Sequence, residues 1–305
     1  MKAELDVTVD LARALLREQH PDLADLPLRV AANGWDNVMV RAGDDLVLRL
    51  PRRAVAAPLI ANELAALPLL APALATAAPG VVVPVPLRSG RPSVALGYPW
   101  PWSVTRWVDG VAAAATPVAA RRAWAPTLAR FLAAVHRPLA AGVTAPGNPF
   151  RGVALRDRRP PALDLTGRVA ALWQAALDAD PYAGPPVWVH GDPHPANLVV
   201  VPGEQGDTPD RLAAVVDFGD ITAGDPASDL GTIWLTFDAA GRAVFRATLA
   251  EAGAGPEGRG WDEATWARAR GWALVFAAAM LAHPEEHPSL VPIGEHAVAA
   301  LVDGL

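Results

Sequence analysis

The hydrophobic and polar positions of the chain follow one pattern in its first third and another in the remainder. Between about residues 28 and 108, short apolar runs alternate with turn residues, and their alternation and β-branched side chains are typical of strands. Gly43-Asp44-Asp45 is suited to a hairpin turn, and one helix is predicted around Ala57–Leu70. Strands are predicted at Leu28–Ala31, Asn37–Arg41, Leu46–Leu50, Val81–Pro84, Ser93–Leu96 and Ser103–Val108.

From about Pro117 onward the apolar positions recur at helical spacing, and Asp262 is expected to cap the last helix. Strand-like segments interrupt this pattern near the middle of the chain, at residues 187–192, 198–201 and 213–218. The chain is therefore expected to have an α+β fold, with a small β-rich N-terminal lobe and a larger, mainly helical C-terminal lobe. Helices are predicted at Val118–Arg137, Thr166–Ala179, Pro226–Glu251 and Asp262–Ala282.

The composition excludes several classes of protein. The 305 residues contain no cysteine, which rules out a disulfide scaffold and a cysteine-ligated zinc site. Lys2 is the single lysine among 26 basic residues, so enzymes that need an internal lysine are excluded. A net charge of -6 argues against a general nucleic-acid partner, and 52% hydrophobic residues are too many for a disordered chain.

The cytoplasm is the expected location. The N-terminus lacks the apolar stretch of a secretory signal. The apolar run Gly271–Ala282, near the C-terminal end, is too short to span a bilayer, so no membrane partner is expected.

Three polar residues in the middle of the chain indicate the chemistry. Asp192 lies in a loop stiffened by prolines, and Asn197 leads from that loop into the predicted strand at 198–201. A turn returns the chain along the next strand to Asp217, so a hairpin is expected to bring Asn197 and Asp217 to the same end. Amide and carboxylate oxygens suit Mg²⁺, and Asp192 could accept a hydroxyl proton beside it. These groups meet the needs of phosphoryl transfer.

The same segment carries a family resemblance. His190-Gly191-Asp192, Asn197, Asp217-Phe218-Gly219 and the later DPASDL resemble the catalytic and metal loops of the aminoglycoside phosphotransferase family, in the protein-kinase-like superfamily. The resemblance spans roughly residues 28–285. It implies a bilobal kinase-like fold with a nucleotide-binding lobe at residues 1–108, containing a five-stranded antiparallel sheet and one helix. The catalytic and acceptor-binding lobe would comprise residues 109–305.

By this resemblance, Asp192 is the catalytic base, and Asn197 and Asp217 hold Mg²⁺. His190 and Asp229 would support the catalytic loop, Asp229 by holding its backbone from the following helix. ATP or GTP would be the co-substrate.

The nucleotide contacts implied by the resemblance include two departures from the family pattern. Arg49 stands where kinases have a lysine, and Glu63, 14 residues later, resembles its ion-pair partner. The nucleotide loop offers only Gly34 in place of a glycine-rich motif. At the hinge, the Arg106 carbonyl and the Val108 amide would face the adenine edge. A guanidinium can still hold phosphate oxygens.

The resemblance also implies a small-molecule hydroxyl acceptor. An aminoglycoside-like antibiotic is expected first, with a role in antibiotic resistance, and a macrolide or a sugar-like or choline-like metabolite second. The segment LVLRLPRR is similar to the macrolide kinases, and Asp220 is the acidic residue expected closest to the chemistry. The chain is expected to act as a monomer or homodimer.

Two functions of other classes stay open at the sequence level. His190, Asp192 and His194 form an H-x-D-x-H pattern that could bind a transition metal in a hydrolase. The arginine at position 49 also permits a pseudokinase that binds nucleotide as a regulator. His136 is expected to be a core histidine with its hydrogen bonds satisfied.

Overall fold

A computed structural model describes residues 3–34, 36–160, 165–203 and 208–303. The chain divides into two compact units. Unit 1 comprises residues 1–72, 83–109 and 217–219, and unit 2 comprises residues 73–82, 110–216 and 220–305. Lys2 lies outside the described residues.

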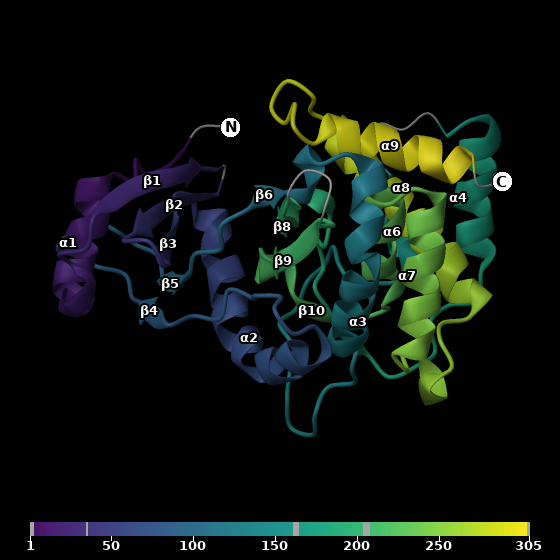
Figure 1. Ribbon diagram of the computed structural model, residues 1–305, viewed down its shortest axis with the longest axis horizontal. Helices are drawn as coiled ribbons and strands as arrows, with labels where there is room; N and C mark the ends of the chain where they lie inside the picture. Colours follow the sequence, from purple (N-terminus) through teal and green to yellow (C-terminus); the bar gives the residue numbers. More distant parts are fainter. Residues whose placement is uncertain (1–2, 35, 161–164, 204–207, 304–305) are drawn as a thin grey trace. The chain divides into compact units, whose positions relative to one another are not determined.

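Unit 1 is built on a five-stranded antiparallel sheet with the order β1-β2-β3-β5-β4 (Figure 1). The strands are β1 Leu28–Asn33, β2 Asn37–Ala42, β3 Leu46–Pro51, β4 Arg88–Gly90 and β5 Trp102–Arg106. Alternate residues of β2 are buried, as expected for a strand with one face on the core. In β3 every residue after Leu46 is buried, because this strand lies in the middle of the sheet.

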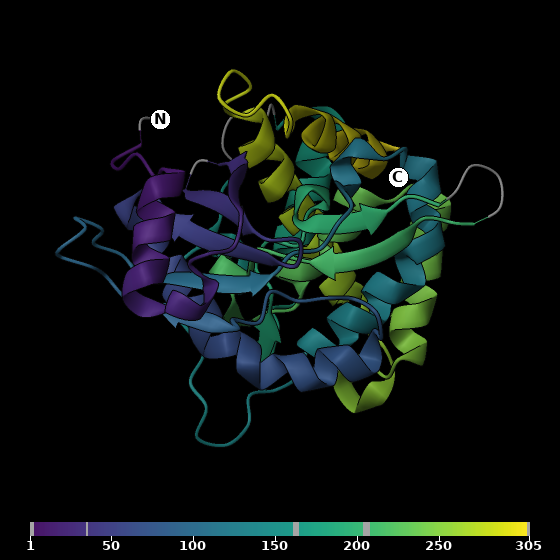
Figure 2. The ribbon, with the colours of Figure 1, turned by 60° about the vertical axis from the view of Figure 1, so that its left-hand side comes forward.

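Helix α1, Val9–Gln19, packs against this sheet (Figure 2). Thr8 caps it by accepting a hydrogen bond from the Leu11 amide. Leu15 and Leu16 are fully buried in the core formed with β2, β3 and β5. No helix is predicted from the sequence here, so α1 is an addition to the expected lobe.

Two of the predicted strands in this region are wrong, and one strand is missed. Val81–Pro84 is not a strand, and Val82 forms only an isolated bridge to Ala214. Ser93–Leu96 is a turn closed by a bridge from Ser93 to Tyr98. The missed strand β4 has no apolar pattern, and it pairs with β5 through its backbone.

Helix α2, Ala57–Ala77, begins in unit 1 and ends in unit 2. Among the described residues, the stretch Ala54–Ala77 is long and apolar enough to cross a membrane by length and composition. Core helices pass the same test, and this one contains Pro68 and Pro72 and presents Glu63 to the sheet. About a third of this apolar stretch is buried within the described structure.

Unit 2 is mainly helical and contains two small sheets. Its helix α8, Glu263–Leu281, is buried on most of its surface, and it contacts α4 (Gly167–Asp178), α5 (Ala227–Leu230) and α9 (Val291–Val302). The strands are β6 Val111–Ala112, β8 Leu198–Val201 and β9 Arg211–Val215 in one sheet, and β7 Val187–Val189 and β10 Thr222–Gly224 in the other. The helices are α3 Ala125–Val135, α4 Gly167–Asp178, α5 Ala227–Leu230, α6 Thr232–Thr236, α7 Ala239–Glu251, α8 Glu263–Leu281 and α9 Val291–Val302.

The predicted helices of unit 2 lie where they were expected, but one of them is broken into shorter helices. The stretch Pro226–Glu251 forms three helices, because Phe237 is extended and Asp238 starts a new one by capping Gly241. Asp262 caps α8 through the Thr265 amide, as predicted. Short 3-10 helices lie at Pro21–Leu23, Ala54–Ala56, Ala113–Ala115, Val118–Trp124, Leu155–Asp157, Pro195–Asn197, Phe218–Asp220 and Pro256–Gly258.

The α+β fold class is confirmed, with its β-rich N-terminal region and helical C-terminal region. The hairpin of β8 and β9 is also confirmed, with Leu198 opposite Val215. Part of its predicted turn, residues 204–207, lies outside the described residues.

Candidate active site

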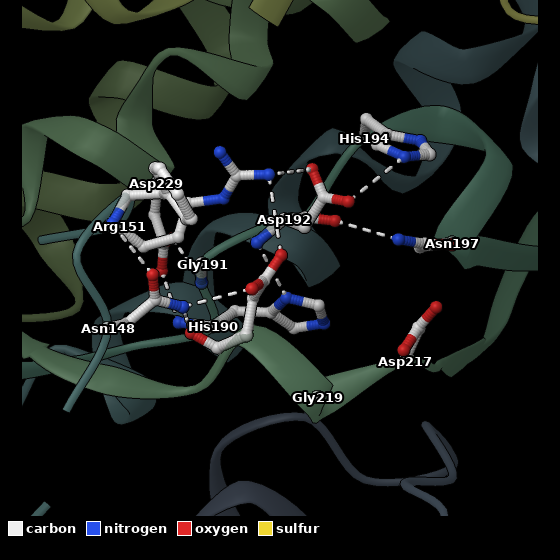
Figure 3. Close-up of polar contacts among 12 residues, drawn as sticks. Asn148, Arg151, His190, Gly191, Asp192, His194, Asn197, Asp217, Gly219 and Asp229 are labelled. Carbon is white, nitrogen blue, oxygen red and sulfur yellow. Dashed lines mark hydrogen bonds and ion pairs between the residues drawn. The ribbon is translucent and has the colours of Figure 1, made fainter. Parts of the chain in front are cut away.

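The loop after β7 is held by one buried carboxylate in unit 2. Asp229, on α5, is fully buried and accepts hydrogen bonds from the His190 amide at 2.7 Å and the Gly191 amide at 2.9 Å (Figure 3). The His136 ring nitrogen Nε2 lies 3.1 Å from the same carboxylate. His136 is therefore a buried core histidine, as predicted, but only one of its ring nitrogens is satisfied, because Nδ1 is buried without a hydrogen-bond partner among the described residues. Because Asp229 holds two successive amides, it fixes the backbone of the loop just before Asp192.

Both ring nitrogens of His190 are engaged by backbone groups, one within this loop and one just after the end of β9. Nδ1 accepts a hydrogen bond from the Asp192 amide at 3.2 Å, and Nε2 lies 3.1 Å from the Val216 carbonyl. The network therefore assigns the neutral ring with its proton on Nε2. A histidine in this state has no nitrogen left for a metal, and the described residues contain no group of three or more His, Cys, Asp or Glu side chains suited to one. The geometry thus gives no support to the H-x-D-x-H hydrolase.

Asp192 lies in a polar shell of its own unit (Figure 3). His194 Nε2 is 3.3 Å from its Oδ2, and an Arg151 guanidinium nitrogen is 3.6 Å from its Oδ1. Burial alone would raise the pKa of Asp192, but the opposing pull of His194 and Arg151 outweighs burial and lowers it. The carboxylate is therefore ionised and oriented, which is the state a general base needs.

Asn197 is tied to the same loop. Its side-chain Nδ2 donates to the Asp192 carbonyl at 2.9 Å, and its backbone amide donates to the His194 carbonyl at 2.8 Å. With Nδ2 engaged, Oδ1 is the side-chain atom left to act as an oxygen ligand. The Val216 amide donates to the Asn197 carbonyl at 2.9 Å, and Asp217 is the next residue in the chain.

The structure adds two residues to the sequence-predicted site. The Arg151 guanidinium lies 3.3 Å from Asp220 Oδ2 as well as beside Asp192. Asn148 holds Asp220 by donating to both its side chain, at 2.9 Å, and its carbonyl, at 3.1 Å. Neither Asn148 nor Arg151 gives a signal in the sequence, because they lie in an irregular loop far from the motif. The expectation that Asp220 lies near Asp192 is in keeping with this geometry.

Gly191 allows the Asp220 segment to approach the catalytic loop closely. It has a φ of 91°, and a Cβ atom there would lie 2.4 Å from the Asp220 carbonyl oxygen. Only glycine fits this combination of left-handed backbone and close contact.

Unit 1 contains a second charged cluster, centred on Arg49. Arg49 lies on β3 and donates to Glu63 at 2.5 Å and to Asp217 at 2.6 Å. The Phe218 amide donates to Glu63 at 3.2 Å. The predicted pairing of Arg49 with Glu63 is thus present, and the guanidinium also contacts the predicted metal ligand Asp217. Asp217 itself has a φ of 63°.

Burial shapes the charges in this cluster. It would lower the pKa of Arg49, but the Asp217 and Glu63 carboxylates outweigh it, so the pKa is raised. Burial raises the pKa of Glu63, against the opposing effect of Arg49. Because Arg49 is 7% exposed and Glu63 only 2%, removing either partner would leave a buried charge without compensation.

The remaining predicted nucleotide contacts lie at turns and strand ends of unit 1. Gly34 is in the turn between β1 and β2, where its amide donates to the Asn37 carbonyl at 3.0 Å. Arg106 is the last residue of β5 and pairs with Leu46, and Val108 follows two residues later. These positions are compatible with the expected roles, which stay predictions.

Comparison with known proteins gives a consistent result. The model of the phosphotransferase enzyme family, APH, matches residues 27–272, which is most of the chain. No curated protein gives a significant match.

Solved structures of similar fold cover nearly the whole chain. A GDP and kanamycin complex of APH(2")-IIIa has 19% identity and a TM-score of 0.63, covering 94% of this chain and 98% of that one. The macrolide 2'-phosphotransferase MphH from Brachybacterium faecium has 25% identity and a TM-score of 0.61, with 96% and 98% covered. A streptomycin and ATP complex of APH(2")-IIa has 15% identity and a TM-score of 0.54, with 95% of each chain covered.

Proposed function

The chain belongs to the APH phosphotransferase family and is a hydroxyl-directed phosphotransferase, and on that premise we propose that it moves the γ-phosphate of ATP or GTP to a small-molecule hydroxyl with the help of Mg²⁺. The observation that carries the proposal is the way the loop around Asp192 is held. Asp229 fixes two successive amides of this loop, and the loop presents the ionised Asp192 carboxylate.

Asp192 is the proposed general base. As the acceptor oxygen forms its bond to the γ-phosphorus, the bond from that phosphorus to the β-phosphate oxygen breaks. The acceptor proton passes to the Asp192 carboxylate, which is held at both oxygens by His194 and Arg151. Because these contacts orient the carboxylate before the acceptor binds, little reorganisation is needed during transfer.

Asn197 and Asp217 are the proposed Mg²⁺ ligands. Their amide and carboxylate oxygens are hard donors of the kind Mg²⁺ prefers. Asn197 fits this role because its Nδ2 is already bonded to the Asp192 carbonyl, which directs Oδ1 elsewhere. A bound magnesium ion supplies neutralisation of the phosphate charge.

The nucleotide is proposed to bind through residues of the N-terminal lobe, residues 1–108, and the acceptor through residues 109–305. Arg49 would contact the phosphates, Gly34 would lie in the nucleotide loop, and the Arg106 carbonyl and Val108 amide would face the adenine. Similar structures contain GDP or ATP, which supports a nucleoside di- or triphosphate ligand. Buried Glu63 would orient Arg49, as its 2.5 Å contact suggests.

The acceptor is proposed to be an antibiotic, with a role in resistance. An aminoglycoside-like compound is the first candidate, because a similar fold has been solved with kanamycin. A macrolide is the second, because the Brachybacterium faecium macrolide 2'-phosphotransferase is 25% identical over nearly the whole chain. We propose that the protein acts in the cytoplasm as a monomer or homodimer, without nucleic-acid or membrane partners.

The test is a transfer assay with purified protein, Mg²⁺ and ATP or GTP. Aminoglycosides, macrolides and sugars are screened by mass spectrometry for the gain of one phosphoryl group. The wild-type protein should phosphorylate at least one acceptor, and Asp192→Asn should lose transfer while it retains nucleotide affinity. Asp262→Asn is the matched control, because asparagine caps a helix as well as aspartate does. Failure to bind nucleotide with Mg²⁺, or full activity of Asp192→Asn, would contradict the proposal.

Loss of Mg²⁺ gives a second measurement. A chelator should stop transfer, and Asp217→Asn should raise the Mg²⁺ concentration needed for half-maximal rate. Nucleotide binding without transfer to any acceptor would instead favour the regulatory pseudokinase.

A further inference from the structure

Arg151 is a charged side chain beside the base that the sequence motifs do not include. One of its guanidinium nitrogens lies 3.6 Å from Asp192 (Figure 3). The same nitrogen lies 3.3 Å from Asp220, so a single cation bridges two carboxylates. The guanidinium also lies over the Phe276 ring, 4.8 Å from its centre. Its side chain is 17% exposed, which leaves the arginine fixed yet close to solvent.

The position of this cation is set by surrounding structure. Asn148 holds Asp220 from one side, and the left-handed Gly191 lets the Asp220 backbone approach the catalytic loop. Phe276 is buried within α8 and supplies a rigid face beneath the guanidinium. Arg151 is therefore a built part of the Asp192 surroundings.

We infer that Arg151 is a positioning and specificity-determining residue that holds Asp192 and Asp220 together and disfavours acceptors with a positive charge next to the reacting hydroxyl. This inference rests on the proposed function, because it concerns the acceptor of the same reaction. An arginine keeps its charge at all ordinary pH values. It therefore already neutralises part of the negative field that would attract a cationic acceptor to Asp192.

Other carboxylates of unit 2 are compensated in the same way. Asp225 forms a buried pair with Arg268 at 2.7 Å. Asp238 pairs with Arg122 at 2.8 Å, and Glu263 pairs with Arg246 at 2.7 Å. These three acidic side chains are thus engaged by arginines of the protein itself. Among the acceptors proposed above, we expect the protein to prefer those with less positive charge next to the reactive hydroxyl.

The experiment compares matched acceptors that differ in charge. Kanamycin is paired with its fully N-acetylated derivative, which keeps the ring hydroxyls and has no ammonium group. A macrolide with one tertiary amine is paired with its neutral N-oxide. For each pair, kcat/KM is measured with the wild-type enzyme, Arg151→Gln and Arg151→Lys.

The wild-type enzyme should favour the neutral member of any pair that is phosphorylated. In Arg151→Gln the ratio should shift toward the cationic member by about tenfold, the effect expected from removing one charge near a partly exposed site. This shift should lie mainly in the KM of the cationic acceptor. Arg151→Lys should keep the wild-type ratio, because it retains the charge.

Arg246→Gln is the matched control. Arg246 also pairs with a carboxylate, Glu263, and lies over an aromatic ring, Trp266, at 4.4 Å. The substitution Arg246→Gln removes the same charge from the protein, but Arg246 does not contact Asp192. The acceptor ratio of this variant should therefore not change. If Arg151→Gln fails to fold, Arg151→Met takes its place, because its stem can still pack on Phe276.

Two results would overturn the inference. One is an unchanged acceptor ratio in Arg151→Gln. The other is a rise only in the KM for nucleotide in this variant, which would mean that Arg151 acts on the nucleotide phosphates and not on the acceptor. If neither pair is phosphorylated at all, the proposed function is in question, and kanamycin binding is measured by calorimetry. Binding to Arg151→Gln that is about tenfold tighter than to wild type then supports the charge role, and equal binding overturns it.

Discussion

Replacing Asp229 by alanine removes the carboxylate that accepts the His190 and Gly191 amides. The side chain is fully buried, so water cannot take its place without a change in structure. Each buried amide left without an acceptor costs about 1–3 kcal/mol, so the two together cost about 2–6 kcal/mol. This is a large part of the 5–15 kcal/mol that typically stabilises a folded protein. Asp229→Ala should therefore lower the free energy of unfolding by several kcal/mol and abolish transfer.

The assay is urea denaturation followed by tryptophan fluorescence, with 11 tryptophans as the signal. Asp262→Ala is the comparison, because it removes a carboxylate that caps α8 near the surface, at a cost of about 1 kcal/mol. Asp229→Asn, which keeps one oxygen, should fall between these two. If Asp229→Ala loses no more stability than Asp262→Ala, the two amides are satisfied in another way and the reasoning is refuted.

The remaining predictions concern Arg49, Gly191 and Asp192. Arg49→Ala should destabilise the fold by about 3–5 kcal/mol, because Glu63 stays buried without its partner, and should weaken nucleotide binding. Arg49→Lys should retain most of the stability, measured by denaturation, and most of the nucleotide affinity, measured by titration. If Arg49→Ala and Arg49→Lys both behave like the wild type, Arg49 is dispensable. Gly191→Ala should lower the free energy of unfolding by about 1–3 kcal/mol or more, and lower kcat, because its Cβ atom would meet the Asp220 carbonyl. A variant as stable and active as the wild type would contradict this. The pKa of Asp192 is lowered from the value of an unfolded aspartate, about 4, so the carboxylate stays ionised at and somewhat below that pH. Protonation of Asp192 should therefore reduce kcat/KM only below about pH 4. A loss of kcat/KM that begins well above that pH and is caused by protonation of Asp192 would contradict the lowered pKa.

The sequence predicts those strands and helices whose side chains bear a clear period. Strands β2, β3 and β5 follow predicted segments because their sequences, NVMVRA, LVLRLP and WSVTR, carry apolar or β-branched side chains at most positions that face the core. Strand β4 is missed because its sequence, Arg88-Ser89-Gly90, has no apolar pattern, and it joins the edge of the sheet by backbone pairing with β5, with Gly90 placed against the Trp102 ring. The break before α7 is also missed, because Asp238 becomes a cap only when Phe237 is extended, and the apolar period continues through it.

The candidate site is predictable where its residues are close in sequence. Asp192 and Asn197 are five residues apart, and the structure joins them by a hydrogen bond. Arg151 could not be found in this way, because its contact with Asp192 joins segments 41 residues apart through an irregular loop. Its position depends on packing against Phe276, which no local pattern of residues encodes.

The backbone of Asp217 has a consequence for how this chain can change over generations. Its φ of 63° lies in the left-handed region, where asparagine and glycine are the best-tolerated residues. In the genetic code, both are a single base change away from aspartate. Either substitution would remove the carboxylate while the turn keeps a backbone that the new residue can adopt. A short mutational path therefore leads from this chain to a folded descendant whose proposed magnesium site has lost its carboxylate while the backbone of the turn is retained.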